Sequence, residues 1–213
     1  MTANTTGSDN TAVGKSSYGT NTTGIQGTAV GSGALELNTT ANYNTAVGCI
    51  ALYSNTTGTE NTAIGRAALT SNTTASSCTA VGMNAMVNNT TGANNTALGS
   101  QALDANTTSA NNTAIGFASL TAQTTGVQNN GLGAYSLQSN TTGAHNVGVG
   151  YNSLGSNTTG NYNIAVGNYA LDSNTTANNN VAIGYDALGA NSTGAELVAV
   201  GGDALKNNTT GAY

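Results

Sequence analysis

The most regular candidate for chemistry in this sequence is the triplet Asn-Thr-Thr, which recurs along the whole chain. An asparagine followed two positions later by threonine is an acceptor for N-linked sugars, which are attached to the side-chain nitrogen. If these turns face solvent, sugars would sheathe the molecule at regular intervals. The predicted acceptors are Asn4, Asn21, Asn38, Asn55, Asn72, Asn89, Asn106, Asn140, Asn157, Asn174, Asn191 and Asn208.

The same residues also suit a structural role, because asparagine and threonine side chains bond readily to the backbone of turns. Where Gln123 removes the acceptor, Thr124 and Thr125 remain. A second asparagine series recurs at the same interval although it forms no acceptor motif. It comprises Asn10, Asn44, Asn61, Asn95, Asn112, Asn129, Asn146, Asn163 and Asn180. We therefore favour a hydrogen-bonded ladder and keep N-glycosylation as the alternative.

A second candidate is a set of large side chains in one slot of alternate repeats. Met83, Phe117, Tyr151 and Tyr185 occupy this slot, and Tyr135 and Tyr169 flank it. If they point outward on stacked strands, they form a stripe with a spacing of about 9.6 Å, two strand separations. Aromatic faces suit both sugar rings and lateral packing. The stripe therefore predicts either contact with glycans or an interface between chains.

Adjacent threonines raise a third possibility, ice binding, which uses flat arrays of outward threonines. Such arrays need threonines at alternate positions, so that both share a face of the strand. The pairs in this chain, such as Thr5 and Thr6, are adjacent, so one member of each pair should point away. Ice binding is therefore the weaker alternative.

The remaining reactive residues are too few and too scattered for catalysis or metal binding. His145 is the only histidine, and the aspartates Asp9, Asp104, Asp172, Asp186 and Asp203 fall in different phases of the repeat. We therefore expect no enzymatic activity, no metal and no cofactor. Cys49 should be a small apolar filler and Cys78 an asparagine-slot variant, without a disulfide between them.

The charge of the chain excludes further classes of protein. Charged residues make up 5% of the 213 residues, and 3 Lys and Arg against 8 Asp and Glu give a net charge of −5. No basic patch is present that could neutralise phosphates, so we expect no nucleic-acid binding. No apolar run approaches the length of about 20 residues that a membrane span needs, and the first residues do not resemble a signal peptide. We expect no membrane insertion.

All these residues are positioned by one repeat of seventeen residues, N-T-T-G-x-x-N-T-A-V-G-x-x-A-L-x-x, without insertion or deletion. Its most constant member is a glycine, found at Gly14, Gly31, Gly48, Gly65, Gly82, Gly99, Gly116, Gly133, Gly150, Gly167, Gly184 and Gly201. Such a repeat is too short for a helical hairpin, which needs about 33 residues, and its glycines and threonines disfavour helix. Short strands separated by turns fit better.

Two apolar columns are expected to fill the interior of such coils. The slot before the constant glycine is always Val, Ile or Leu, and the threonine slot two residues earlier becomes Val147, Ile164, Val181 and Val198 in late copies. Residues two apart share a face, so we expect both slots to face inward. The second inward column is Leu35, Leu52, Leu69, Leu103, Leu120, Leu137, Leu154, Leu171, Leu188 and Leu205, with Tyr18 and Met86 as variants. The constant glycine should mark a corner that needs positive φ or close backbone approach.

The predicted fold is therefore all-β, a parallel β-solenoid (β-roll or β-helix) of about twelve seventeen-residue coils. A weaker alternation suggests that repeats are paired, either as two coils or as the halves of one large turn. Residues 1–213 should form a single repeat solenoid without end caps. Because exposed terminal edges can template further pairing, we expect it to belong to a longer fibre or to stack end to end.

The late copies Asn163-Ile164-Ala165-Val166-Gly167 and Asn180-Val181-Ala182-Ile183-Gly184 resemble the YadA-like head repeats of trimeric autotransporter adhesins. Similar repeats occur in tail fibres of bacteriophages and in bacterial surface proteins. The resemblance covers the whole chain but rests on about seven of the seventeen positions. It implies a left-handed parallel β-roll, often a homotrimer, outside the cell or on a virion.

These patterns together predict an extracellular structural fibre protein that forms a rigid rod or filament. Its main partner should be itself, through end-to-end or lateral homo-oligomers, including a trimer. The alternatives are an adhesin head or phage tail-fibre shaft that binds surface glycans, and an ice-binding protein.

Overall fold

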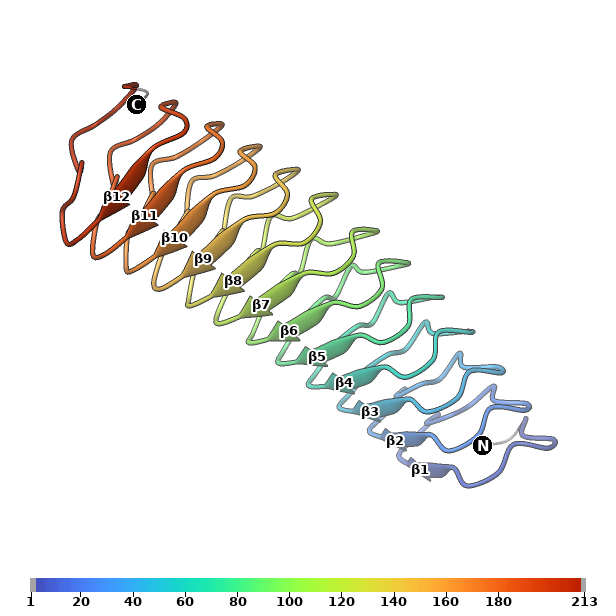
Figure 1. The fold of residues 1–213 in the computed structure, drawn as a ribbon. Coiled ribbons are helices and arrows are strands. Elements are labelled where there is room, and N and C mark those ends of the chain that lie inside the picture. The colour runs from blue at the N-terminus through green and yellow to red at the C-terminus, as the bar shows by residue number, and fades with distance from the viewer. Residues whose placement is uncertain (1–2, 212–213) are drawn as a thin grey trace.

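The computed structural model describes residues 3–211 and contains one sheet of short parallel strands. The order of the strands in the sheet is their order in the sequence. The strands are β1 (Thr11–Val13), β2 (Thr28–Val30), β3 (Thr45–Val47), β4 (Thr62–Ile64), β5 (Thr79–Val81), β6 (Thr96–Leu98), β7 (Thr113–Ile115), β8 (Asn130–Leu132), β9 (Val147–Val149), β10 (Ile164–Val166), β11 (Val181–Ile183) and β12 (Val198–Val200). Figure 1 shows an elongated stack of coils that the chain climbs from one end to the other. The predicted all-β parallel solenoid is confirmed.

One coil takes seventeen residues. Thr11 pairs with Thr28 in the next strand, and the same step separates every pair up to Val181 and Val198. A single large turn built from two repeats is therefore excluded. The alternation between neighbouring repeats is a pattern of side chains laid over coils of equal length.

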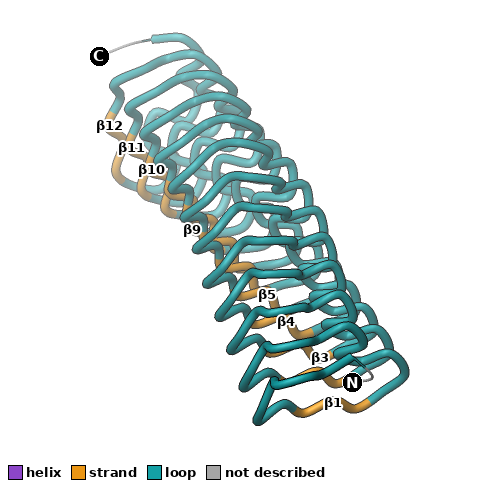
Figure 2. The backbone as a smooth tube through the Cα atoms, turned by 90° about the vertical axis from the view of Figure 1, so that its right-hand side faces the viewer, coloured by secondary structure: helices purple, strands orange, loops and turns teal. Residues whose placement is uncertain are grey.

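The coils are also hydrogen-bonded to one another outside the strands. The N–H of Thr22 donates to the carbonyl of Thr39 at 2.9 Å, and the N–H of Leu35 donates to the carbonyl of Ala51 at 3.1 Å. Figure 2 shows the turns stacked above one another in the same way as the strands. Several sides of each coil are thus tied to its neighbours, which favours a stiff rod.

The interior is narrow and is filled by leucine and alanine. The predicted leucine column is fully buried from Leu35 to Leu188, with Tyr18 and Met86 equally buried in the same column. Alanines at the strand centres, such as Ala46 and Ala97, belong to the same core. The prediction for this column is therefore confirmed over most of the rod, while Leu205 at its far end is exposed.

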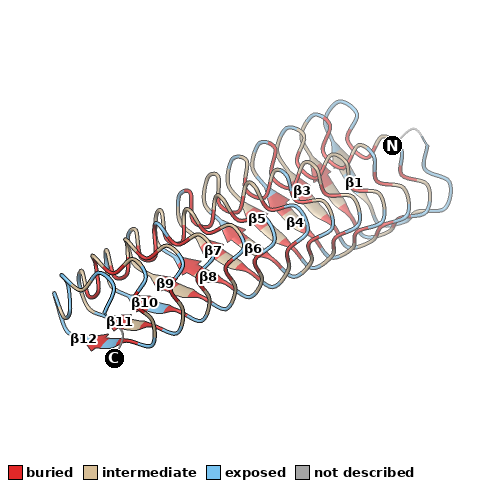
Figure 3. Ribbon diagram, turned by 90° about the horizontal axis from the view of Figure 1, so that it is seen from above, coloured by how far each residue is buried: buried red, intermediate tan, exposed pale blue. Residues whose placement is uncertain are grey.

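The prediction that the valine slot faces the interior is wrong. In β3 the central Ala46 is buried, whereas Thr45 and Val47 on either side of it are only half-buried. Ile64 and Leu98, which occupy the valine slot in coils with a neighbour on both sides, are 40% and 45% exposed. Alternate residues of a strand point to opposite faces, and a thin coil that already encloses leucine has room only for alanine at the strand. Figure 3 shows this order of burial repeating along the rod.

The corner after each strand needs glycine for both of the predicted reasons. Gly48 has a φ of 138°, and a Cβ at this position would clash with the carbonyl of Gly65 in the next coil. The leucine column also lies in the left-handed region, for example Leu103 with a φ of 52°. Residues other than glycine rarely adopt this conformation, and the sequence pattern did not indicate it.

The first coil shows how a larger residue fits inside. Tyr18 replaces leucine, and its hydroxyl lies where a Cβ of residue 27 would be, so that only Gly27 leaves it space. The buried hydroxyl has no hydrogen-bond partner, and desolvation by burial raises the pKa of Tyr18 to about 12. Tyr18 and Gly27 therefore depend on each other.

Candidate functional site

The twelve predicted acceptor asparagines and Gln123, here called the acceptor column, lie mostly inside the rod. Asn38 Nδ2 donates to Asn21 Oδ1 in the preceding coil at 3.0 Å and to the carbonyl of Ala41 at 3.1 Å. This pair of bonds recurs along the column. The fully buried members are Asn21, Asn38, Asn55, Asn72, Asn89, Asn106, Gln123, Asn140, Asn157, Asn174 and Asn191, whereas Asn4 is exposed and Asn208 is partly exposed.

A sugar on the buried nitrogens is incompatible with this packing. A carboxamide nitrogen has two hydrogens, and in Asn38 both are donated within the protein. An N-linked glycan replaces one of them and needs a path to solvent. The acceptor interpretation therefore fails for the buried asparagines of the folded coil, and the structure contains the alternative, a hydrogen-bonded ladder.

The ladder is irregular at two places. Asn174 Oδ1 has no partner, because Asn191 Nδ2 donates only to the carbonyl of Gly194 at 2.9 Å. Gln123 is one methylene longer than asparagine, and its Nε2 reaches Oδ1 of Asn112 at 3.1 Å. Asn112 belongs to the other asparagine series, so Gln123 links the two series.

That other series, here called the second asparagine column, is buried along most of its length. Asn44 Nδ2 donates to the carbonyl of Gly58 at 2.8 Å, and Asn44 Oδ1 accepts from the N–H of Asn61 at 2.9 Å. Each such asparagine bridges to the following coil through both polar atoms. Most buried polar groups in folded proteins are paired, because an unpaired one costs free energy, so the paired carboxamides of both columns favour this register of the coils.

Cys78 occupies a position in the second asparagine column, as predicted. Its N–H donates to Asn61 Oδ1 at 3.0 Å, and its Sγ donates to the carbonyl of Gly92 at 3.3 Å. Desolvation by burial raises the pKa of the Cys78 thiol. The prediction that Cys49 is an apolar filler is wrong, because Cys49 is exposed at a corner; both thiols are free.

The predicted stripe lies on the outside of the rod and is denser than expected. Met83 and three rings of its slot are exposed, while Tyr135 and Tyr169 are half-buried between them. Successive ring centroids lie 5.4, 5.6, 5.4 and 6.1 Å apart, with neighbouring rings close to perpendicular. We call this set the aromatic ladder, and its members are Phe117, Tyr135, Tyr151, Tyr169 and Tyr185.

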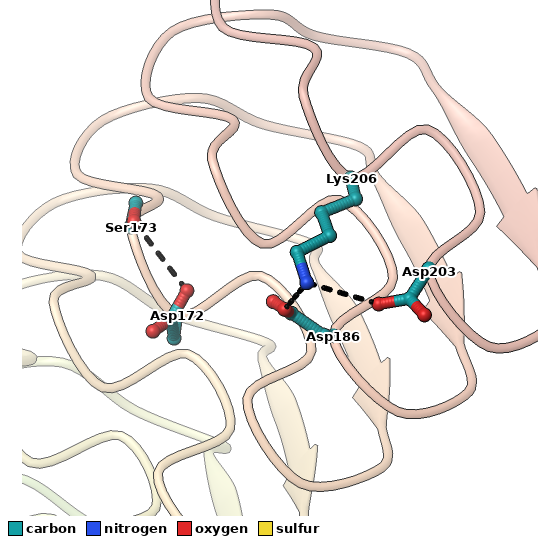
Figure 4. A network of polar contacts seen from close by, with 5 residues as sticks. All are labelled: Asp172, Ser173, Asp186, Asp203 and Lys206. Carbon is teal, nitrogen blue, oxygen red and sulfur yellow. Dashed lines mark hydrogen bonds and ion pairs between the residues drawn. The ribbon is translucent and has the colours of Figure 1, made fainter.

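Charged side chains meet near the last strand. Lys206 Nζ lies 2.7 Å from Asp186 Oδ2 and 3.1 Å from Asp203 Oδ1, as Figure 4 shows. The pKa of Lys206 is raised mainly by its hydrogen bond to Asp186 and next by its hydrogen bond to Asp203. The pKa of Asp172 is raised by desolvation and then by the negative charge of Asp186. The contacts of Lys206 are those of a surface ion pair, and beside them Ser173 Oγ donates to Asp172 Oδ1 at 3.4 Å (Figure 4).

No metal-binding cluster of His, Cys, Asp and Glu occurs within residues 3–211. His145 is exposed, and its ring stacks on Tyr162 with centroids 4.8 Å apart.

The outward residues of the strands form a regular surface along the rod, here called the strand face. No member of it is charged, and none is buried. Its first column is Thr11, Thr28, Thr45, Thr62, Thr79, Thr96, Thr113, Asn130, Val147, Ile164, Val181 and Val198, and its second column is Val13, Val30, Val47, Ile64, Val81, Leu98, Ile115, Leu132, Val149, Val166, Ile183 and Val200. Both columns were recognised in the sequence, but they were predicted to face the interior.

Comparison of the chain with protein-family models, curated proteins and solved structures found no match. The resemblance to adhesin head repeats therefore stays a prediction. Across the described residues, no helix is long and apolar enough to span a membrane.

Proposed function

We propose that this chain is a rigid rod in a fibrous structural protein at the surface of a cell or virion, and that copies of the rod associate side by side. Its role is mechanical rather than catalytic. The observation that carries the proposal is the strand face, which presents two uncharged columns on the twelve strands of residues 3–211.

The construction of the coils supports a mechanical role. Each coil adds about 4.8 Å to the rod, so the eleven steps from β1 to β12 extend it by about 53 Å. Backbone bonds, the leucine column and two asparagine columns all connect each coil to the next. Bending the rod would stretch many of these short bonds together, because no long loop interrupts the repeat.

The strand face is the surface that a neighbouring rod would cover. Contiguous exposed apolar surface on a soluble protein marks an interaction site. From β9 to β12 both columns are aliphatic, and Ile164 and Ile183 within this stretch are 39% and 41% exposed. A partner can match this face at every coil only if it has the same coil spacing, and a second copy of the chain has that spacing.

Charges placed on the strand face should separate the rods. We expect the double variant Ile164→Lys, Ile183→Lys to weaken self-association by about tenfold or more, because the interface would bury unpaired charges. Sedimentation velocity over a wide range of protein concentration measures this effect and gives the number of chains.

The control is the double variant Thr142→Lys, Thr159→Lys, which adds the same charge at exposed positions outside the strand face. It should associate as the unmodified chain does. An unmodified chain that stays monomeric at every concentration, or equal effects of both variants, would contradict lateral association.

A second candidate, ice binding, is supported by one feature of the same face. The first column is threonine in β1 to β7, two residues before Val, Ile or Leu, which repeats hydroxyl and methyl groups at every coil of this stretch. The adjacent threonine pairs do not form such an array, since the first of each pair bonds to the next coil, as Thr56 Oγ1 does to the carbonyl of Thr73 at 3.0 Å.

Ice binding predicts thermal hysteresis in solutions of the chain. The double variant Thr62→Lys, Thr79→Lys should abolish it, and Thr57→Lys, Thr74→Lys, at exposed positions off the strand face, should retain it. Absence of hysteresis with the unmodified chain would remove this candidate and leave the fibre.

A further inference from the structure

The rings of the aromatic ladder alternate between exposed and half-buried positions. Phe117, Tyr151 and Tyr185 are 45%, 43% and 56% exposed. Tyr135 and Tyr169 are half-buried, and each contacts the ring before it and the ring after it edge to face. The half-buried rings therefore fix the orientation of the exposed ones, which form a preorganised row directly after strands β7, β9 and β11.

We propose that this row binds a linear β-1,4-linked polysaccharide along the axis of the rod. The apolar C–H face of a pyranose ring stacks on aromatic rings, as other apolar groups do. In a β-1,4-linked chain each sugar is turned over relative to the one before, so the same face recurs at every second sugar. The exposed rings recur at every second coil, about 9.6 Å apart, so that three alternate sugars can each meet one ring.

The surroundings of the ladder favour a neutral ligand. The chain has only three cationic residues, Lys15, Arg66 and Lys206, and Lys206 is held by Asp186 and Asp203. Between Tyr151 and Tyr185 the same slot holds the exposed Asn168, whose Oδ1 accepts the N–H of Tyr151 at 2.8 Å. This bond orients the side chain and leaves its Nδ2 available to donate to a sugar hydroxyl.

Calorimetric titration of the full chain with cellohexaose, chitohexaose and maltohexaose tests the proposal. We expect binding of one or both β-1,4-linked probes and none of maltohexaose, whose α-linked sugars do not lie in a flat ribbon. Tyr151→Ala should weaken binding by roughly tenfold, the loss of one aromatic stacking contact. Tyr43→Ala is the matched control, because Tyr43 is similarly exposed and lies outside the ladder.

The half-buried rings are positioning residues, and a separate pair of variants tests them. Tyr135→Ala should weaken binding, and Tyr135→Phe, which keeps the ring, should restore it; thermal unfolding of each variant checks the fold. No binding of either β-1,4-linked probe, equal binding of maltohexaose, or equal losses in the Tyr151 and Tyr43 variants would overturn the proposal. The proposal would also be overturned if the unmodified chain bound no sugar and Tyr151→Ala lost self-association, since the ladder would then be an interface between copies.

This proposal goes beyond the fibre function and can fail separately from it. The strand-face variants should bind the sugars normally, and the ladder variants should associate normally. A result in which Ile164→Lys, Ile183→Lys loses sugar binding while remaining folded would overturn the assignment of the site to the ladder.

Discussion

At the scale of single residues, the asparagines show how polar side chains can hold a narrow coil together. The chain offers few large apolar groups, and buried carboxamides make up for them by bonding to the coils above and below. Asn72, for example, donates to Asn55 Oδ1 at 2.8 Å and to the carbonyl of Ala75 at 3.0 Å, and accepts from Asn89 Nδ2 at 3.3 Å.

Removing one such carboxamide should therefore be costly. We expect Asn72→Ala to lower the free energy of unfolding by about 2–4 kcal/mol, because it leaves buried partners unsatisfied and opens a cavity. Urea unfolding measures the loss. Thr74→Ala, an exposed neighbour, should change stability by less than about 0.5 kcal/mol, and similar losses in both variants would contradict the ladder.

The burial of the acceptor column also predicts the mass of the protein. After expression in cells that attach N-linked sugars, the folded chain should show no hexose-sized increments at Asn21 to Asn191, since these nitrogens are inaccessible. Intact and peptide mass spectrometry checks this expectation. Glycosylated peptides from the middle of a folded rod would contradict the packing.

Tyr18 predicts a change of stability with pH. Its pKa is raised from 10.0 to about 12 in the folded chain, so the folded state holds this proton more tightly than the unfolded state. Its contribution is complete below pH 10 and is lost as the pH rises through the folded value, by up to about 3 kcal/mol. Urea unfolding between pH 9 and pH 12 should show a smaller decline in Tyr18→Phe, and parallel declines would argue against the buried hydroxyl.

At the scale of one coil, the sequence predicted the strand but not its orientation. The alternation of Thr, Ala and Val correctly placed Thr45 and Val47 on one face. The prediction then placed that face inside, because it assigned the larger apolar groups to the core. The side-chain volume that the interior can hold determines the orientation instead, since the leucine column leaves room only for Ala46 at the strand. The left-handed φ of the leucines has no marker in the residue types, since leucine seldom adopts it.

Two leucines in adjacent parts of one coil test this orientation. Leu103 is fully buried and Leu98 on the strand face is 45% exposed. Leu103→Ala should cost about 2–5 kcal/mol, as deletions in a packed core do, and Leu98→Ala should cost less than about 1 kcal/mol in the dissociated chain. Urea unfolding at low protein concentration compares them, and a larger cost at Leu98 would reverse the assignment of faces.

At the scale of the whole molecule, the regular spacing of Gly14, Gly31 and their successors was enough to predict the solenoid, because every coil must make the same step. The candidate surfaces were harder to predict. The sequence marked Phe117, Tyr151 and Tyr185 as one row, but the edge-to-face contacts of Tyr135 and Tyr169 depend on the corner geometry that the structure supplies. The strand face was hidden by the assumption that aliphatic residues are buried.

The central claim is that seventeen residues make one coil and that each coil lifts the chain by one strand spacing. Pulsed electron paramagnetic resonance on nitroxide labels tests it most directly. The labels are placed at Thr40→Cys and Thr159→Cys, which are exposed and seven coils apart, with Cys49→Ser and Cys78→Asn to remove the native thiols. We expect one narrow distance of about 34 Å, seven strand spacings. The pair Thr40→Cys and Thr142→Cys, six coils apart, should be shorter by about 4.8 Å. Broad distributions, or a distance that does not change by one strand spacing per coil, would contradict the account.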